Sequence, residues 1–181
     1  MIKLNALKSA AAALILLASG SAFAQVSSGT GQDVALNATL QETLTVSLDQ
    51  AAVNFTLTSG SATNAGDVAV TATTSWILGA GRTDVKLYAY FDDPTSALSV
   101  GASKIASSQV SAKVGGSDVG AFTSVVPFGT GVTIFDQAIT DANRTSSQNS
   151  PVTLNIDLAS TPQLAAGVYT GTLHFQAQAT T

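Results

Sequence analysis

The sequence predicts an all-β protein, an antiparallel β-sandwich of eight or nine strands, and three observations lead to that fold class. Apolar side chains recur at every second position over much of the chain, which is the period of a strand that buries one face. Gly, Pro, Asn and Asp separate these runs at fairly even intervals, as turns between short strands do. After residue 24 no stretch has the period of a long amphipathic helix, so the sheets are expected to pack on each other.

The first 24 residues have the layout of a secretory signal peptide, which would be cleaved and take no part in the fold. Lys3 and Lys8 give a positive start, residues 10–18 form an apolar run, and residues 22–24 read A-F-A, an A-x-A cleavage site. The apolar run is too short to cross about 30 Å of hydrocarbon as an anchor. We therefore expect the protein to be exported by a bacterium, with cleavage after Ala24.

The mature chain that remains has 157 residues, with five basic and eleven acidic side chains, one His and no Cys. Its length suits one domain. Residues 25–32 are small and polar and read as a flexible lead-in, and residues 33–181 are expected to form a single β-sandwich domain. The lack of a cationic surplus excludes a nucleic-acid-binding surface. The lack of Cys excludes disulfide scaffolds, thiolate metal sites and cysteine nucleophiles.

Residues 34–48 form the longest alternating run, with apolar side chains at even positions and mostly polar ones between them. Glu42 alone breaks the series. Since the run exceeds the usual length of a strand, a bend or bulge near Glu42 is expected to divide it. The apolar positions that make this run a candidate assembly strand are Val34, Leu36, Leu40, Leu44, Val46 and Leu48.

The remaining strands are predicted from shorter runs of the same kind. Residues 95–108 are dominated by small polar side chains and are expected to be an exposed loop. Two antiparallel sheets that each bury one face give a sandwich of immunoglobulin-like type, with a closed barrel as the alternative. The runs lie at residues 53–57, 68–78, 85–91, 110–114, 132–134, 152–158 and 169–177.

The polar faces of these strands are almost uncharged. Ser and Thr supply 41 of the 157 mature residues, against 16 charged ones. Thr suits a strand because it is β-branched, but it does not repel another strand as the Lys-rich edges of many β proteins do. Either loops guard the sheet edges, or pairing at an edge is part of what the protein does.

Few residues could carry catalysis or bind a metal. His174 lies between Leu173 and Phe175 with opposite parity and is expected on the polar face of the last strand. No serine-nucleophile motif and no further His accompany it, so no catalytic residue, cofactor or metal site is assigned. Asp92 and Asp93 precede a proline and fit a turn better than a calcium loop.

Trp76, Tyr88 and Tyr90 are the candidate ligand-binding residues. Aromatic faces bind the apolar side of sugar rings, so the three could form a platform for a glycan. The alternative places Trp76 in the core between the sheets, where immunoglobulin-like domains often keep one tryptophan.

The segment 167–175 reads G-x-Y-x-G-x-L-x-F and follows a turn. It resembles the closing strand of bacterial secreted β-sandwich modules, namely fimbrial and pilus subunits and spore-coat-U-like proteins. The resemblance implies that Tyr169, Leu173 and Phe175 anchor the hydrophobic core. Two departures stand out. Pilus subunits of the chaperone–usher type usually carry a Cys pair, which is missing here, and Tyr169 does not lie near the C-terminal end, as their assembly motif requires.

The sequence therefore favours an exported, non-catalytic structural or adhesive protein of the periplasm, cell surface or extracellular space. It would act as a fimbria-like subunit that assembles by strand addition, in which an extended segment of one subunit completes the sheet of the next. Its partners would be copies of itself or other surface subunits, without nucleic acid and without a transmembrane anchor. Two alternatives stand beside this one: residues 34–48 pair within their own domain, or the protein is a monomeric module that binds a glycan or a protein.

Overall fold

The computed structural model describes residues 34–123, 131–161 and 163–181. The predicted signal peptide and the lead-in at residues 25–32 lie outside the described residues. The chain divides into two units, residues 1–38 and 39–181. Residues 34–38 of the first unit are exposed and have no regular secondary structure, and the second unit holds all the described strands. No helix in the described ranges is long and apolar enough to cross a membrane.

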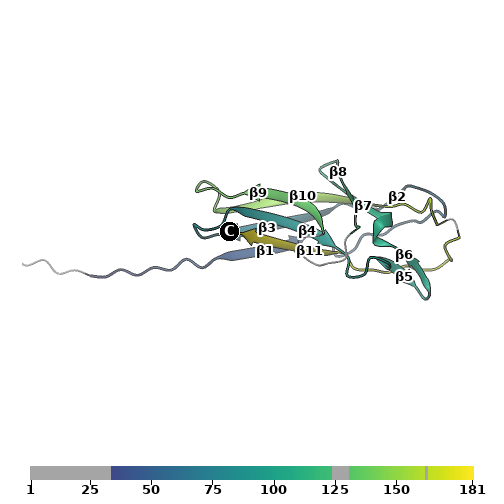
Figure 1. Cartoon of the computed structure of the whole chain (residues 1–181), viewed down its shortest axis with the longest axis horizontal. Helices are drawn as coiled ribbons and strands as arrows, with labels where there is room; N and C mark the ends of the chain where they lie inside the picture. The colour runs from purple at the N-terminus through teal and green to yellow at the C-terminus, as the bar shows by residue number, and fades with distance from the viewer. Residues whose placement is uncertain (1–33, 124–130, 162) are drawn as a thin grey trace, which may run out of the picture. The chain divides into compact units, whose positions relative to one another are not determined.

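The larger sheet of the second unit has six antiparallel strands in the order β1-β3-β10-β7-β8, with β2 paired to β10 (Figure 1). β3 alternates strictly between more and less buried residues, as the period-two pattern of its sequence predicts. Pro151 lies where β10 passes from pairing with β3 to pairing with β7. The strands are β1 (Thr43–Leu48), β2 (Asn64–Ala65), β3 (Val70–Ile77), β7 (Val110–Val114), β8 (Ser117–Ala121) and β10 (Thr145–Ile156).

The smaller sheet has three antiparallel strands in the order β11-β4-β9, and a separate hairpin pairs β5 with β6. A 3-10 turn, η1 (Ser107–Gln109), follows the hairpin and leads into β7. Gly115 and Gly116 join β7 to β8 with positive φ angles of 56° and 88°, the conformation of a tight hairpin turn. The strands are β4 (Asp84–Tyr90), β5 (Leu98–Val100), β6 (Ser103–Ile105), β9 (Val132–Ala138) and β11 (His174–Thr180).

The two sheets bury their apolar faces against each other and form an antiparallel β-sandwich, as the sequence predicts. Eleven strands lie in the described residues, and eight of these have five or more residues. The main core includes Leu87, Phe122 and Ile156. A smaller cluster around Trp76 and Val85 fills the other part of the interior.

The prediction of an exposed loop at residues 95–108 is wrong. This stretch forms the β5–β6 hairpin and the 3-10 turn, and Ala97, Ile105 and Ser107 are buried. The sequence did not predict this hairpin because small polar side chains dominate it. A hairpin this short needs only a few apolar contacts to pack on the core.

Candidate functional site: an apolar groove between two strand edges

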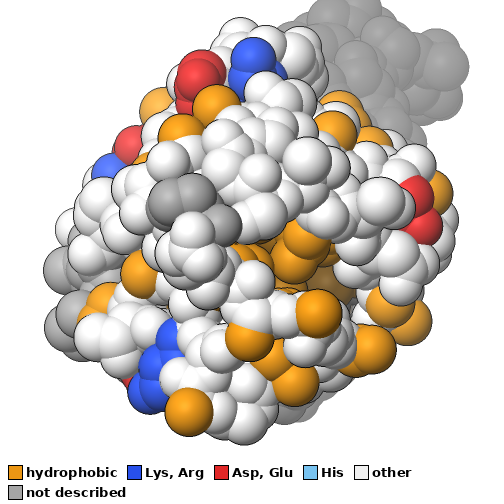
Figure 2. Space-filling view, turned by 90° about the vertical axis from the view of Figure 1, so that its right-hand side faces the viewer, with side chains coloured by type: hydrophobic (Ala, Val, Ile, Leu, Met, Phe, Trp, Pro, Cys, Tyr) orange, Lys and Arg blue, Asp and Glu red, His pale blue; other side chains and the backbone are white. Residues whose placement is uncertain are grey.

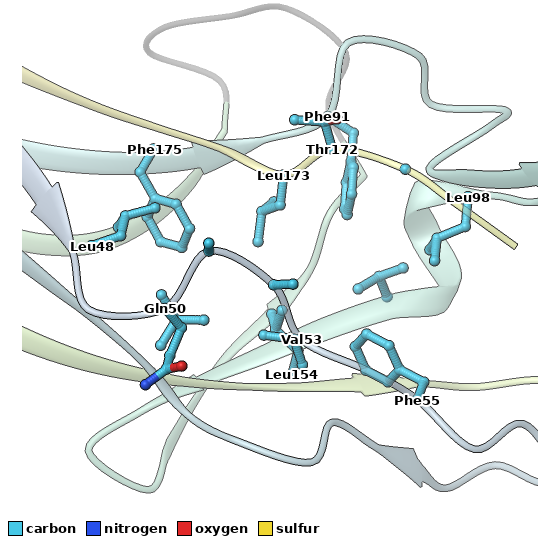
Figure 3. Close-up of a pocket in the computed structure, with 15 residues that line it drawn as sticks. Leu48, Gln50, Val53, Phe55, Phe91, Leu98, Leu154, Thr172, Leu173 and Phe175 are labelled. Carbon is cyan, nitrogen blue, oxygen red and sulfur yellow. The ribbon is translucent and has the colours of Figure 1, made fainter.

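An apolar groove lies between residues 48–57, which continue from the end of β1, and residues 164–175, which lead into β11. Two adjoining hollows of about 230 and 730 Å³ share Val53, Phe55, Leu98 and Gly171 in their lining. In Figure 3, Leu48 lies beside Phe175 at one end of the first hollow, and Leu173 and Val53 face each other farther along it. Figure 2 shows the end of the second unit near β5 and β6, where hydrophobic side chains line the bottom of a hollow.

The first wall is an extended segment with one hydrogen-bonded edge. The N–H of Asn54 donates to the Asp67 carboxylate at 2.9 Å, and the Asn54 carbonyl accepts the Asp67 N–H at 2.9 Å. Thr58, four residues farther on and of the same parity, donates its N–H to the Asn64 side chain at 2.6 Å. In an extended chain the backbone groups of successive residues point to opposite edges. The N–H and C=O groups of Val53, Phe55 and Leu57 therefore point to the other edge, where the structure gives them no partner among the described residues.

The second wall is held in the same one-sided way. Thr170 and Ser99 exchange two backbone hydrogen bonds of 3.1 and 2.9 Å, which tie this wall to β5. Farther along, β11 pairs with β4 on one side and with no described strand on the other. Both walls thus present apolar side chains to the groove and leave an unpaired backbone edge, which is the arrangement that an added strand requires.

The two edges belong to different sheets. β1 is the outer strand of the six-stranded sheet and β11 is the outer strand of the three-stranded sheet. The two strands approach each other without pairing, so the sandwich is closed by side chains along β1 and β11 and opens into the groove beyond them.

The structure divides the candidate assembly strand into two parts. Leu44, Val46 and Leu48 lie in β1, which pairs with β3 of the same chain from Thr43↔Ile77 to Leu48↔Ala72. These three positions were therefore wrongly included. Val34, Leu36 and Leu40 precede β1 and are 80%, 90% and 78% exposed. Burying three such side chains would contribute about 1.5–3 kcal/mol each, so this segment is the apolar element that lacks a partner in the described structure.

The three predicted core anchors line the groove. Tyr169, Leu173 and Phe175 pack against the main core but are only partly buried. The Tyr169 hydroxyl donates to the Ala165 carbonyl at 2.8 Å. Gly171 lies so close to β5 that a Cβ there would meet the Ala97 carbonyl, which explains why glycine stands in this wall.

The predicted aromatic platform does not form. Trp76 is 3% exposed in the smaller core cluster and donates its indole N–H to the Asn143 carbonyl at 2.8 Å. Tyr88 and Tyr90 lie in β4, in the other sheet, and Tyr88 is 8% exposed. Side chains of β3 alternate between its two faces, and Trp76 lies on the buried one. Trp76 therefore cannot share an exposed platform with Tyr90.

His174 lies on the polar face of β11, as the parity of its strand predicts. Its Nε2 lies 3.0 Å from an Asp92 carboxylate oxygen, and its ring stacks on Tyr90 with centroids 5.1 Å apart. The described residues contain no group of three or more His, Cys, Asp or Glu that could hold a metal ion. His174 has no second histidine and no nucleophile beside it in the contacts of this face.

Several carboxylates stabilise backbone turns. Hydrogen bonds from the Asn54 side chain and backbone N–H lower the pKa of Asp67. Hydrogen bonds from the Thr95 hydroxyl and N–H likewise lower the pKa of Asp93, which fits the predicted turn before Pro94. Asp67 fastens the first wall of the groove to the sheet, a role that the sequence analysis missed because its partner lies 13 residues away.

The groove itself also escaped the sequence analysis. Val53, Phe55 and Leu57 share one parity and were predicted as strand residues, but nothing in a period-two pattern tells a paired edge from an open one. The one available signal was the scarcity of charge near the edges. No known protein-family model matches the chain, and no curated protein matches it.

Proposed function

We propose that the protein is an exported structural subunit that assembles by strand addition, with residues 34–40 of one copy lying in the apolar groove of another. The supporting observation is that one chain carries both halves of such a contact. It has a groove between two unpaired edges and, outside its own strands, an exposed segment with apolar side chains at alternate positions.

The exposed segment is shorter than the groove wall and fits within it. The first wall runs from Leu48 to Leu57, which is about 30 Å at roughly 3.3 Å per residue. Residues 34–40 extended span about 20 Å on the same scale. The segment can therefore lie within the groove and place its alternate side chains toward the core, while its backbone pairs with one or both walls.

The segment cannot fill the groove of its own domain. The chain enters the domain at Glu42, which contacts Gly79 and Arg82 beyond the end of β3. The groove begins near Val70 at the start of β3, about 26 Å away along eight strand residues. Leu40 and Leu36 reach only about 7 and 20 Å back from Glu42, so Val34 alone could touch the near end of the groove. A second copy of the chain is the occupant that the geometry favours.

The direction of insertion follows from the same geometry. The donor domain begins at β1, directly after the segment, and it has to stay outside the acceptor. Leu40 then lies at the open end of the groove, near Leu158 and Tyr169, and Val34 lies about 20 Å deeper, near Ala51. Each copy donates at one end and accepts at the other, so the contact is head-to-tail and generates an open filament.

The test uses the mature chain, residues 25–181, examined by sedimentation and negative-stain microscopy. Wild type is expected to form filaments, whereas Leu36→Asp is expected to weaken assembly by about 100-fold or more, because an unpaired carboxylate would enter an apolar groove. Asn37→Asp is the matched control, since it adds the same charge one residue away on the other face and should still assemble. A wild-type chain that stays monomeric at high concentration would overturn the proposal.

A further inference from the structure

A carboxylate side chain lies at each end of β1. Each accepts a hydrogen bond from a backbone N–H of the β3 side that would otherwise donate to a carbonyl of a longer β1. At the first end, a Glu42 oxygen accepts the Gly79 N–H at 2.6 Å. At the second end, an Asp49 oxygen accepts the Thr71 N–H at 2.6 Å, while the Asp49 N–H still donates to the Thr71 carbonyl at 3.2 Å.

The register shows what these contacts replace. Thr43 lies opposite Ile77 and Ser47 opposite Thr73, so a longer β1 would set residue 41 opposite Gly79 and Asp49 opposite Thr71. Leu78 donates its N–H to the Arg144 carbonyl on the β10 side. Since successive N–H groups alternate between edges, the Gly79 N–H points toward β1. Glu42 thus occupies the donor that the carbonyl of residue 41 would need for β1 to continue.

The first end is also fixed by its surroundings. Arg82 donates to Glu42 through Nη2 at 2.8 Å and through Nε at 3.3 Å, and Arg144 donates through Nη1 to the Gly79 carbonyl at 2.7 Å. A Cβ on residue 79 would lie 2.7 Å from the Glu42 oxygen, so glycine leaves the space that the carboxylate needs. An exposed ion pair contributes little stability. The Arg82–Glu42 pair therefore matters here because it holds Glu42 against the Gly79 N–H, and not because it stabilises the fold.

We propose that Glu42 and Asp49 act as strand caps that divide residues 34–57 into a donated segment, a retained strand β1 and a groove wall. Glu42 takes the Gly79 N–H that the Gln41 carbonyl would need, so β1 begins at Thr43 and the chain leaves the sheet there, with residues 34–41 outside it. Asp49 ends the pairing with β3 and lets the chain turn into the first wall. This inference rests on the proposed function, because it explains how one continuous alternating run supplies both halves of the contact.

Glu42→Val removes the first cap and restores the apolar alternation. We expect it to extend β1 by one pair onto Gly79, so the freed Gly79 N–H should donate to the Gln41 carbonyl, as the ladder register requires. The Gly79 carbonyl keeps its hydrogen bonds from Arg82 and Arg144. The measurement is the NMR coupling through the hydrogen bond between the Gly79 amide nitrogen and the Gln41 carbonyl carbon, on mature chains that carry Leu36→Asp and are therefore expected to stay monomeric. Asp141→Ala is the control, because it breaks the Asp141–Arg144 pair at the same end and leaves Glu42 in place.

The monomer experiment separates the two proposals. A coupling between Gly79 and the Gln41 carbonyl with Glu42 present, or no such coupling with Glu42→Val, would overturn the capping role even if wild type forms filaments. A coupling that appears only with Glu42→Val supports the capping role, and filament formation by wild type is then judged on its own. In chains without Leu36→Asp, Glu42→Val should lower filament yield several-fold, whereas Asp141→Ala should not change it.

Discussion

The hydroxyl of Thr74 is buried and has no hydrogen-bond partner among the described residues. It lies in the middle of β3 on the face that Ala72 and Trp76 share, and it is 0% exposed. Burying an unpaired hydroxyl costs free energy that a methyl group would not. Thr74→Val should therefore raise the free energy of unfolding by about 1 kcal/mol in urea titrations.

The neighbouring residue gives the control for this substitution. Thr73 points to the other face and its hydroxyl donates to the Asn149 side chain at 2.9 Å. Thr73→Val removes that hydrogen bond and should bring no gain in stability. If Thr74→Val destabilises the domain by more than about 1 kcal/mol, the Thr74 hydroxyl does have a hydrogen-bond partner, which contradicts this prediction.

Glu42 links stability to pH. The Arg82 guanidinium, aided by the Gly79 N–H, holds the pKa of this carboxyl below its ordinary value of 4.5. A carboxyl with a lowered pKa in the folded state stabilises the fold above its unfolded pKa, and this contribution disappears as the pH falls through the folded pKa. Urea midpoints between pH 6 and pH 3 should therefore fall less for Glu42→Gln than for wild type. An equally steep fall would contradict this assignment, since Asp67 and Asp93 remain in both chains.

At the scale of elements, Gly171 controls the second wall of the groove. A Cβ at this position would collide with the Ala97 carbonyl, so Gly171→Ala should push the wall away from β5 and destabilise the domain by about 1–3 kcal/mol. Gly81→Ala is the matched control, because a Cβ there meets nothing within 4 Å. Thermal melts that show equal stability for the two variants would mean that the wall moves freely.

Which elements the sequence could predict depends on how local their determinants are. The alternation of β3 and β4 made both strands and their buried faces predictable, because a strand has one period and two faces. The predicted bend or bulge near Glu42 falls where β1 begins, at Thr43, so the break in the alternating run was predictable but its form was not. The β5–β6 hairpin was not, since its few apolar residues gain their importance from Thr170 and the core, far away along the chain.

The candidate site was predictable only in its exposed half. The apolar positions before Glu42 were assigned to a candidate assembly segment, and Leu44, Val46 and Leu48 were assigned to the same segment because parity alone does not reveal a partner strand. The acceptor half needs the topology, in which β1 and β11 end up as outer strands of different sheets. That relation depends on pairings between residues 84 to 96 positions apart, which no local pattern encodes.

At the scale of the whole molecule, the proposed assembly gives a role to the low charge of the chain. Thr and Ser cover strand faces and edges where many β proteins place Lys, and an unprotected edge is a hazard for a monomer but a requirement for strand addition. The lack of Cys means that any joint between subunits would depend on backbone pairing and apolar burial alone.

The most direct test mixes two variants that each lack one half of the contact. Leu36→Asp keeps the groove and loses the segment, whereas Val53→Glu keeps the segment and blocks the groove; Leu57→Glu replaces it if Val53→Glu fails to fold. Sedimentation velocity of each mature variant alone should show monomers, and an equimolar mixture should form a 1:1 complex that grows no further, because only one segment and one groove remain. A mixture that stays monomeric, although both variants are folded and wild type assembles, would contradict strand addition as the way this protein assembles.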